Sequence, residues 1–275
     1  MKPLHILDEK LDNISFAFSM RVLESDYEGP LIRLRKARIA GVLIDEEKDF
    51  GWADNDIVDV AAIDAWRGTS EVYVTIWYDQ SGLGRNAVQT NILFQPVFYT
   101  NTVLPYFQGD GINDFLTVSG GGIQVVTTNG VQGTVIGTMR ATNRNQHSFG
   151  VLTGSDRWSS HVNWSDGSLY FDPGFCCNNP RSFNNSGKAG FWDIYTFIKT
   201  ATNAIVRSTL VERFNGTHTS GRCTRTENFA ICWAAGDGTI NYATTGFNEL
   251  IMYKTDIAAT QYQEIESDSK TFWGI

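Results

Sequence analysis

Long apolar runs are missing from this sequence. A membrane-spanning helix needs about 20 consecutive, mainly apolar residues, whereas polar residues interrupt every apolar stretch of this chain. The first residues, Met1-Lys2-Pro3-Leu4-His5, also lack the apolar segment of a secretory signal. We therefore expect neither a membrane span nor an ordinary N-terminal secretion signal.

Cysteine and proline are scarce. The 4 cysteines match no zinc-ligand spacing and have no histidine pair beside them, which argues against a metal site built on thiolates. The 6 prolines are scattered and form no linker. No period of about 20 to 50 residues repeats, which excludes a solenoid or a propeller. The cysteines are Cys176, Cys177, Cys223 and Cys232.

Positive charge is also in short supply. The formal net charge is −8, which argues against a nucleic-acid partner, because such proteins need basic patches for the phosphate backbone. One basic cluster remains, Arg33-Leu34-Arg35-Lys36-Ala37-Arg38. Its alternation favours the solvated face of a strand, and a site for an anionic polymer is the alternative.

The sequence is rich in glycine and in apolar side chains. It has 26 glycines, and 42% of its 275 residues are hydrophobic, which indicates a sizeable core and short strands joined by turns. We predict strands around residues 31–35, 74–78, 95–97, 104–107, 115–118, 134–140, 191–199, 204–213, 229–234 and 247–253. Residues 15–23 fit a helix or a strand equally well. Together, these predicted strands indicate an all-β sandwich.

The expected organisation is simple. Residues 1–13 are polar and charged, and we interpret them as an N-terminal arm or short helix ahead of one domain, residues 14–275. Minor helices are predicted over Val58 to Trp66 and from Ala258 onward. Between residues 45 and 59 seven carboxylates gather. A solvated loop is the simpler interpretation, and a structural calcium site is the alternative, although the spacing lacks a regular calcium-loop pattern.

One stretch is unusually specific, Val74 to Ala87. Its first half alternates β-branched and aromatic residues as a half-buried strand does, and its second half, Asp79-Gln80-Ser81-Gly82-Leu83-Gly84, is typical of a tight turn. The Gly-x-Ser-x-Gly motif of a nucleophile elbow is missing. We expect Asp79 and Ser81 to hydrogen-bond the loop backbone, while Trp77 and Tyr78 hold the loop to the core.

Several short motifs follow one another along the chain. They are Phe18-Ser19-Met20-Arg21 with Tyr27-x-Gly29-Pro30, then Asp49-Phe50-Gly51, Trp77 to Asn86, Phe107-x-Gly109-x-Gly111-x-x-Asp114-Phe115-Leu116 and Gly246 to Tyr253. In this order they resemble the catalytic domain of α-L-arabinofuranosidase B and related concanavalin A-like domains, many of them in bacteriophage virion proteins. The resemblance covers most of residues 14–275. It implies an all-β, concanavalin A-like jelly-roll β-sandwich with a few short helices.

The resemblance also suggests catalytic residues. A retaining glycosidase needs two carboxylates about 5–5.5 Å apart, and Asp237 of Gly236-Asp237-Gly238 resembles the family's acid/base. The family's nucleophile lies in a Met-Glu-Asn motif that this chain lacks. The late glutamates Glu212, Glu227 and Glu249 suit strand surfaces or turns, so we name no confident catalytic residue beyond Asp237.

Cys176 and Cys177 are adjacent, as in the enzymes of this family, where a disulfide between neighbouring cysteines forms a flat wall against the sugar. Here the pair follows Tyr170-Phe171-Asp172-Pro173-Gly174, whereas the similar motif comes after the pair in the enzymes. A disulfide between adjacent residues is also strained. A vicinal disulfide and two reduced cysteines are both possible, and we favour the reduced pair.

The richest candidate binding surface lies near these cysteines. The segment from Asp156 to Gly167 sets aromatic rings beside amides, hydroxyls and carboxylates, which suits sugars, because sugars offer C–H faces to rings and hydroxyls to polar groups. Core positions for the two tryptophans, a structural role for His161 and ion pairs for Arg157 and Arg181 are the alternatives. The candidate ligand-binding residues are Trp158, His161, Trp164, Asp172, Cys176, Cys177 and Asp237.

Three functions remain open. The first is a bacteriophage virion surface protein, a capsid or tail accessory or spike, that binds host cell-surface glycans, is assembled in the host cytoplasm and acts outside the cell. The second is an α-L-arabinofuranosidase-like hydrolase. The third is a purely architectural decoration or spike subunit. In the virion interpretations the N-terminal arm contacts other virion proteins and the chain is a homo-oligomer.

Overall fold

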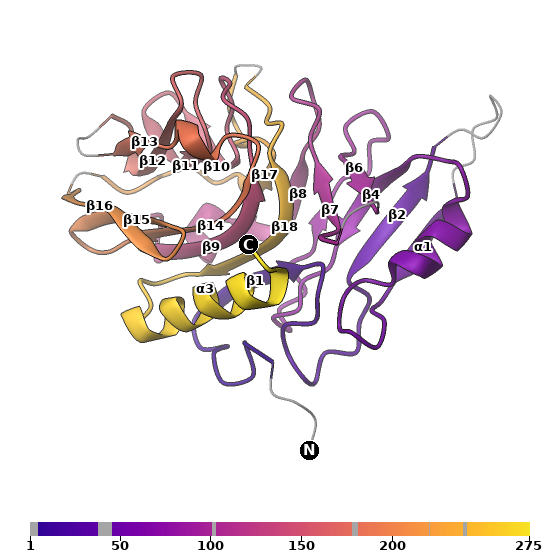
Figure 1. Ribbon diagram of the computed structural model, residues 1–275. Helices are drawn as coiled ribbons and strands as arrows, with labels where there is room; N and C mark the ends of the chain where they lie inside the picture. The colour runs from indigo at the N-terminus through magenta and orange to yellow at the C-terminus, as the bar shows by residue number, and fades with distance from the viewer. Residues whose placement is uncertain (1–4, 38–45, 101–102, 178–180, 220, 239–240) are drawn as a thin grey trace.

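The computed structural model describes residues 5–37, 46–100, 103–177, 181–219, 221–238 and 241–275. Within these ranges the protein is built from antiparallel strands with three α-helices and one short 3-10 helix (Figure 1). The strands pair into one continuous hydrogen-bonded ribbon that folds over into two packed layers. The all-β prediction is thus confirmed.

The first layer has β18 and β9 at its centre. Its strand order is β16–β15–β14–β9–β18–β1, and every pairing in it is antiparallel. The strands span Ile14–Ser19 (β1), Gly133–Arg140 (β9), Trp192–Lys199 (β14), Asn203–Ser208 (β15), Val211–Thr217 (β16) and Gly246–Tyr253 (β18).

The second layer is longer and also antiparallel, in the order β13–β12–β11–β10–β17–β8–β5–β4–β2–β3. Two short strands, β6 (Val97–Tyr99) and β7 (Tyr106–Gln108), join its β4 to β18 of the first layer. The other strands are Ile32–Lys36 (β2), Glu47–Phe50 (β3), Val72–Trp77 (β4), Ala87–Val88 (β5), Leu116–Gly122 (β8), Phe149–Thr153 (β10), Asp156–His161 (β11), Ser168–Phe175 (β12), Ser182–Asn184 (β13) and Asn228–Ile231 (β17).

The main core lies between the two layers and is dominated by aromatic rings. Phe197 on β14 contacts Phe149 on β10 and Phe171 on β12, with ring centroids 5.1 and 5.3 Å apart. Phe16 on β1 contacts Phe229 on β17 at 5.4 Å. Because successive strand residues point to opposite faces, each strand sends one set of side chains into this core and the other set outward.

A second apolar cluster covers the outer face of the first layer. The helix α3 (Ala259–Trp273) lies across β14 and β9, and Tyr262 and Ile265 pack against Ile136 and Ile194 (Figure 1). Leu7 joins the same cluster and is fully buried. The described part of the N-terminal arm thus packs on its own domain, and its contact with a neighbouring virion protein stays a prediction.

The remaining helices are short. Helix α1 (Val60–Arg67) confirms the predicted helix, and Asp59 caps it by accepting a hydrogen bond from the amide of Ala62. The others are α2 (Ile123–Val126) and the 3-10 helix at Ser186–Lys188. Residues 15–23, for which the sequence left helix and strand open, begin within β1, which ends at Ser19. No helix among the described residues has the length and apolar character needed to span a bilayer.

The loop after β4 behaves as expected in most respects. Asp79 accepts hydrogen bonds from the amides of Ala17, Ser81 and Arg85 and from the Ser81 hydroxyl, at 2.8–2.9 Å. Trp77 is fully buried in the core. Tyr78 differs from the expectation, because its hydroxyl donates to Asp49 at 2.7 Å instead of entering the core.

The charged segments near the N-terminus form separate pairs. Arg33 binds Asp49 at 2.7 Å and Lys36 binds Glu46 at 3.0 Å. Arg35 and Lys36 are buried, so the predicted solvated face is wrong for these two residues, which are instead paired within the fold. Arg38, the last residue of the cluster, lies outside the described residues, as does Asp45 of the acidic segment. The described part of the chain holds no cluster of three or more potential metal ligands, so nothing there supports the calcium alternative.

Candidate functional site

A cleft of about 420 Å³ opens beside the outward-facing side of β10, β11 and β12. Its walls come from these strands, from the segments just before β10 and just after β12, and from the connection between β17 and β18. The lining residues are His147, Leu152, Gly154, Arg157, His161, Trp164, Asp166, Tyr170, Cys176, Cys177, Arg181, Asp237 and Asn241.

Strand register explains which side chains meet here. On β11 the alternate positions Arg157 and His161 share the outward face, and antiparallel pairing sets His161 opposite Tyr170 of β12. The intervening Trp158 has the opposite orientation. It is fully buried, packs against Phe171 with ring centroids 5.2 Å apart, and does not line the cleft. This corrects the expectation that Trp158 binds ligand.

A wholly buried carboxylate, Asp172, organises one side of the cleft. One terminal nitrogen of Arg181, Nη1, lies 2.6 Å from both carboxylate oxygens. Arg157 Nη1 and His161 Nε2 lie 3.6 and 3.7 Å from the Oδ2 atom. Burial alone would raise the pKa of Asp172, but the His161 and Arg181 contacts outweigh it and lower the pKa to about 2. Asp172 is therefore a fixed negative charge beneath the cleft.

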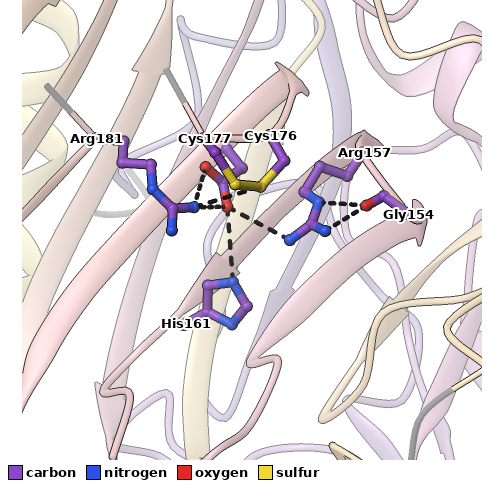
Figure 2. Close-up of a disulfide and its surroundings, with 7 residues drawn as sticks. Gly154, Arg157, His161, Cys176, Cys177 and Arg181 are labelled. Atoms are coloured by element: carbon purple, nitrogen blue, oxygen red, sulfur yellow. Dashed lines mark hydrogen bonds and ion pairs between the residues drawn. A yellow bond between two sulfur atoms is a disulfide. The ribbon is translucent and has the colours of Figure 1, made fainter. Parts of the chain in front are cut away.

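The vicinal cysteines form part of the wall. Cys176 and Cys177 are joined by a disulfide, so the predicted reduced pair is wrong. Figure 2 shows the disulfide between the side chains of Arg181 and Arg157, with His161 below it. Arg181 Nη1 also lies 3.7 Å from the Cys176 sulfur. The bridge gives the cleft a compact apolar surface next to two cations.

The opposite side holds an acid and a histidine. Asp237 Oδ2 lies 3.3 Å from His147 Nε2, and both side chains are largely buried. Burial lowers the pKa of His147 to about 4 despite the neighbouring carboxylate. His147 is therefore neutral at pH 7. Its ring lies 4.3 Å from that of His161, which in turn lies 4.7 Å from the Trp164 ring.

His161 is oriented by the backbone. Its Nδ1 lies 2.8 Å from the carbonyl oxygen of Gln146, an atom that only accepts. The Nδ1 atom therefore donates to this carbonyl, and Nε2 faces the carboxylate of Asp172. The two histidine rings thus lie between the two carboxylates of the cleft, in the order Asp172, His161, His147 and Asp237.

The late glutamates lie elsewhere. Glu249 is buried on β18, where it binds Arg21 at 2.8 Å and accepts a hydrogen bond from Ser19. Glu227 pairs with Arg225, and Glu212 is exposed on β16. Among the described residues no glutamate lines the cleft. The carboxylates at or beneath its surface are Asp166, Asp172 and Asp237.

The sequence predicted much of this site. His161, Trp164, Cys176, Cys177 and Asp237 line one cleft, and Asp172 lies beneath it. Arg157 and Arg181 form the predicted ion pairs with Asp172 and also line the cleft. His147 and Tyr170 were missed. Tyr170 could have been found from its alternation with Asp172 on one strand, whereas nothing local marks His147.

Searches with protein-family models and against curated proteins give no match to this chain. Solved structures do resemble it. An arabinofuranosidase complexed with arabinofuranosyl-α-1,2-xylobiose superposes with a TM-score of 0.67 at 15% identity, over 92% of this chain and 61% of that one. A GH54 α-L-arabinofuranosidase mutant soaked with 4-nitrophenyl α-L-arabinofuranoside superposes with a TM-score of 0.68 at 15% identity, over 96% of this chain and 63% of that one.

More distant sandwiches match less of the chain. A mutant Trypanosoma rangeli sialidase displaying trans-sialidase activity gives a TM-score of 0.50 at 8% identity, over 72% of this chain and 32% of that one. The chain thus spans about three fifths of the length of the arabinofuranosidases it resembles. At these identities the comparisons establish the β-sandwich fold, which is shared with carbohydrate-active proteins.

Proposed function

We propose that this chain is a carbohydrate-binding β-sandwich protein and that the cleft beside β11 and β12 holds the sugar. The observation that carries the proposal is that one cleft is lined both by apolar groups, namely Trp164, Tyr170 and the vicinal disulfide, and by polar groups, namely Arg181 and Asp237. Sugars combine C–H faces with hydroxyls that both donate and accept, so they need both kinds of surface.

The electrostatics fit a hydroxyl-rich ligand. Arg181 uses one terminal nitrogen for Asp172, which leaves the other N–H groups of its guanidinium to donate to sugar oxygens. Asp237 supplies an accepting carboxylate. The ion pairs of Asp172 hold the side chains of Arg157 and Arg181 in place, which limits the conformational entropy lost when the ligand binds. The similar arabinofuranosidases were complexed or soaked with arabinofuranosides, which supports a sugar ligand here.

Glycan-array screening followed by calorimetry tests the proposal. We expect Trp164→Ala to weaken binding of the best array ligand by at least about 5-fold through the lost ring contact. Trp66→Ala should leave binding unchanged, because Trp66 lies on α1, far from β11 and β12 (Figure 1), and does not line the cleft. An array without any hit for the folded wild-type protein would contradict a carbohydrate-binding role.

We further propose that the protein works on a bacteriophage virion, as a homo-oligomeric capsid or tail accessory protein or spike that meets host glycans. The support is the set of motifs around Trp77 to Asn86 that resembles virion domains. Mass spectrometry of purified particles should detect the chain, and light scattering should give an oligomer. A purely architectural subunit would also be present on particles but would bind no glycan.

A glycoside hydrolase is the second candidate. Asp237 favours it, because this carboxylate lines the cleft and pairs with His147 as an acid/base residue could. Hydrolysis of an aryl α-L-arabinofuranoside that is abolished by Asp237→Asn would establish it. Sugar binding without turnover of any furanoside would leave the lectin-like function alone.

A further inference from the structure

A second aromatic surface lies near the other end of the long layer. Trp52 follows β3 and is partly exposed, and it borders two neighbouring hollows of about 320 and 470 Å³. Glu28 also lines both hollows. The first is completed by His5, Val22, Ser25, Tyr27 and Asp56, and the second by Gly29, Pro30, Asp49 and Gly51.

The surface is distinct from the cleft already described. β11 and β3 are separated by seven strand-to-strand steps through β10, β17, β8, β5, β4 and β2. At about 4.8 Å per step this amounts to roughly 34 Å along the sheet. No described residue lines both the cleft and these hollows, so we expect a ligand at Trp52 to bind independently of one at Trp164.

The aromatic groups are held in place. The rings of Trp52 and Tyr27 lie 6.1 Å apart, and the Tyr27 hydroxyl donates to the carbonyl of Pro30. Backbone pairing between Trp52 and Val58 fixes the tryptophan from the other side. Because the indole is anchored by its backbone and by a neighbouring ring, it can offer a rigid flat surface without an ordering cost when a ligand binds.

The polar groups around the indole are mainly acceptors. The carboxylates are those of Glu28, Asp49 and Asp56. Asp49 is paired with Arg33, and Asp56 lies 3.3 Å from His5 Nε2, whereas no described residue pairs with the exposed Glu28. Carboxylates accept hydrogen bonds from hydroxyls and repel anions, so the surface suits a ligand rich in hydroxyl donors and free of acidic groups.

From this geometry we propose that Trp52 and the carboxylates around it form a second carbohydrate-binding site, specific for neutral oligosaccharides. Stacking of a sugar ring on the indole provides the contact area, and Glu28 and Asp56 accept hydrogen bonds from its hydroxyls. Two sites on one rigid domain let the protein hold a polysaccharide at two places, which strengthens attachment beyond either single affinity.

Affinity electrophoresis through gels containing neutral polysaccharides (arabinan, xylan, galactan, glucan or mannan) tests the proposal, with Trp164→Ala as the background that weakens binding at the cleft. We expect at least one gel to retard Trp164→Ala. Adding Trp52→Ala should lower the association constant by roughly 2- to 12-fold. Adding Trp52→Phe should retain most of the affinity. Adding Glu28→Gln should lower the association constant by less than Trp52→Ala does. Phe191→Ala removes an exposed ring that lines neither site and is the matched control.

Two results would overturn the proposal. One is a Trp164→Ala protein that none of the neutral gels retards. The other is a folded Trp164→Ala/Trp52→Ala protein, verified by its melting temperature, that is retarded as strongly as Trp164→Ala alone. If Trp52→Ala instead converts an oligomer into a monomer in light scattering and leaves retardation unchanged, the surface is a contact between copies of this chain. Weaker retardation of Trp164→Ala than of the wild type, with the remaining retardation dependent on Trp52, would support both sites.

Discussion

At the scale of single residues, Asp172 is the group on which the cleft depends. It is fully buried and lies against two guanidinium groups and an imidazole. Breaking a buried ion pair by removing one partner is costly, because the remaining charge is left without compensation. The same carboxylate also positions Arg181, which we propose contacts the sugar, so stability and binding are linked through one side chain.

We predict that Asp172→Asn lowers the free energy of unfolding by about 3–5 kcal/mol at pH 7, measured by urea denaturation. The pKa of Asp172 falls from its ordinary value of 3.8 to about 2 on folding. The unfolded state thus binds the proton more readily, and about 2 kcal/mol of stability, fully present above pH 4 to 5, is lost as the pH falls toward 2.

The difference in free energy of unfolding between the wild type and Asp172→Asn should therefore become smaller as the pH falls from 4 to 2. Asp166→Asn is the matched control, because Asp166 is an exposed carboxylate at the rim of the same cleft and its loss should change stability little. A gap that stays constant across this pH range would contradict the role assigned to the Asp172 charge.

At the scale of elements, the loop after β4 connects the two layers of the fold. Asp79 fixes the turn at Ser81 and Arg85 and also binds the amide of Ala17 on β1. The loop therefore ties the long layer to β1 at the edge of the first layer. None of its residues lines the cleft, so its specificity in sequence reflects architecture and not chemistry.

We predict that Asp79→Ala lowers the free energy of unfolding by about 3 kcal/mol or more, because several buried donors lose a charged acceptor at once. Ser81→Ala removes one side-chain hydrogen bond to Asp79 and should cost about 1 kcal/mol. Urea denaturation followed by tryptophan fluorescence measures both. Unchanged stability in Asp79→Ala, or impaired glycan binding in a well-folded variant, would argue against a purely structural loop.

At the scale of the whole molecule, the N-terminal segment is part of the folded unit. Leu7 is fully buried beneath α3, its amide donates to the carbonyl of Leu23, and Lys10 pairs with Glu264. Residues 5–13 thus help to cover the outer face of the first layer. Any contact they make with a virion partner would use the exposed side of this segment.

We predict that Leu7→Ala costs about 2–5 kcal/mol, because it opens a cavity under α3, and that deletion of residues 1–13 costs at least as much. Glu9→Ala, at an exposed position of the same segment, is the control. Thermal and urea unfolding of the three variants measures these effects. A truncated protein as stable as the full chain would show that the segment is a detachable arm.

The residues that carry the site were partly visible in the sequence and partly not. The pattern of Thr134 to Arg140 and of Phe247 to Tyr253 predicted β9 and β18, because apolar and β-branched residues predominate in both segments. β11 and β12 escaped prediction, since their outward positions carry Arg157, His161 and Asp172, and these polar residues interrupt the apolar pattern. Residues 204–213, predicted as one strand, form β15 and β16 with a turn at Thr209 and Leu210.

The sequence by itself determined the fold class, the specific loop at Asp79 and the gathering of polar and aromatic residues between Asp156 and Cys177. These features depend on local pattern: side-chain alternation, turn-forming residues and short motifs. Only the tertiary structure decided that Trp158 faces the core, that Cys176 and Cys177 are joined, and that His147 and Asp237 pair on one side of the cleft. Those outcomes depend on strand register and on contacts between distant segments, which local sequence does not encode.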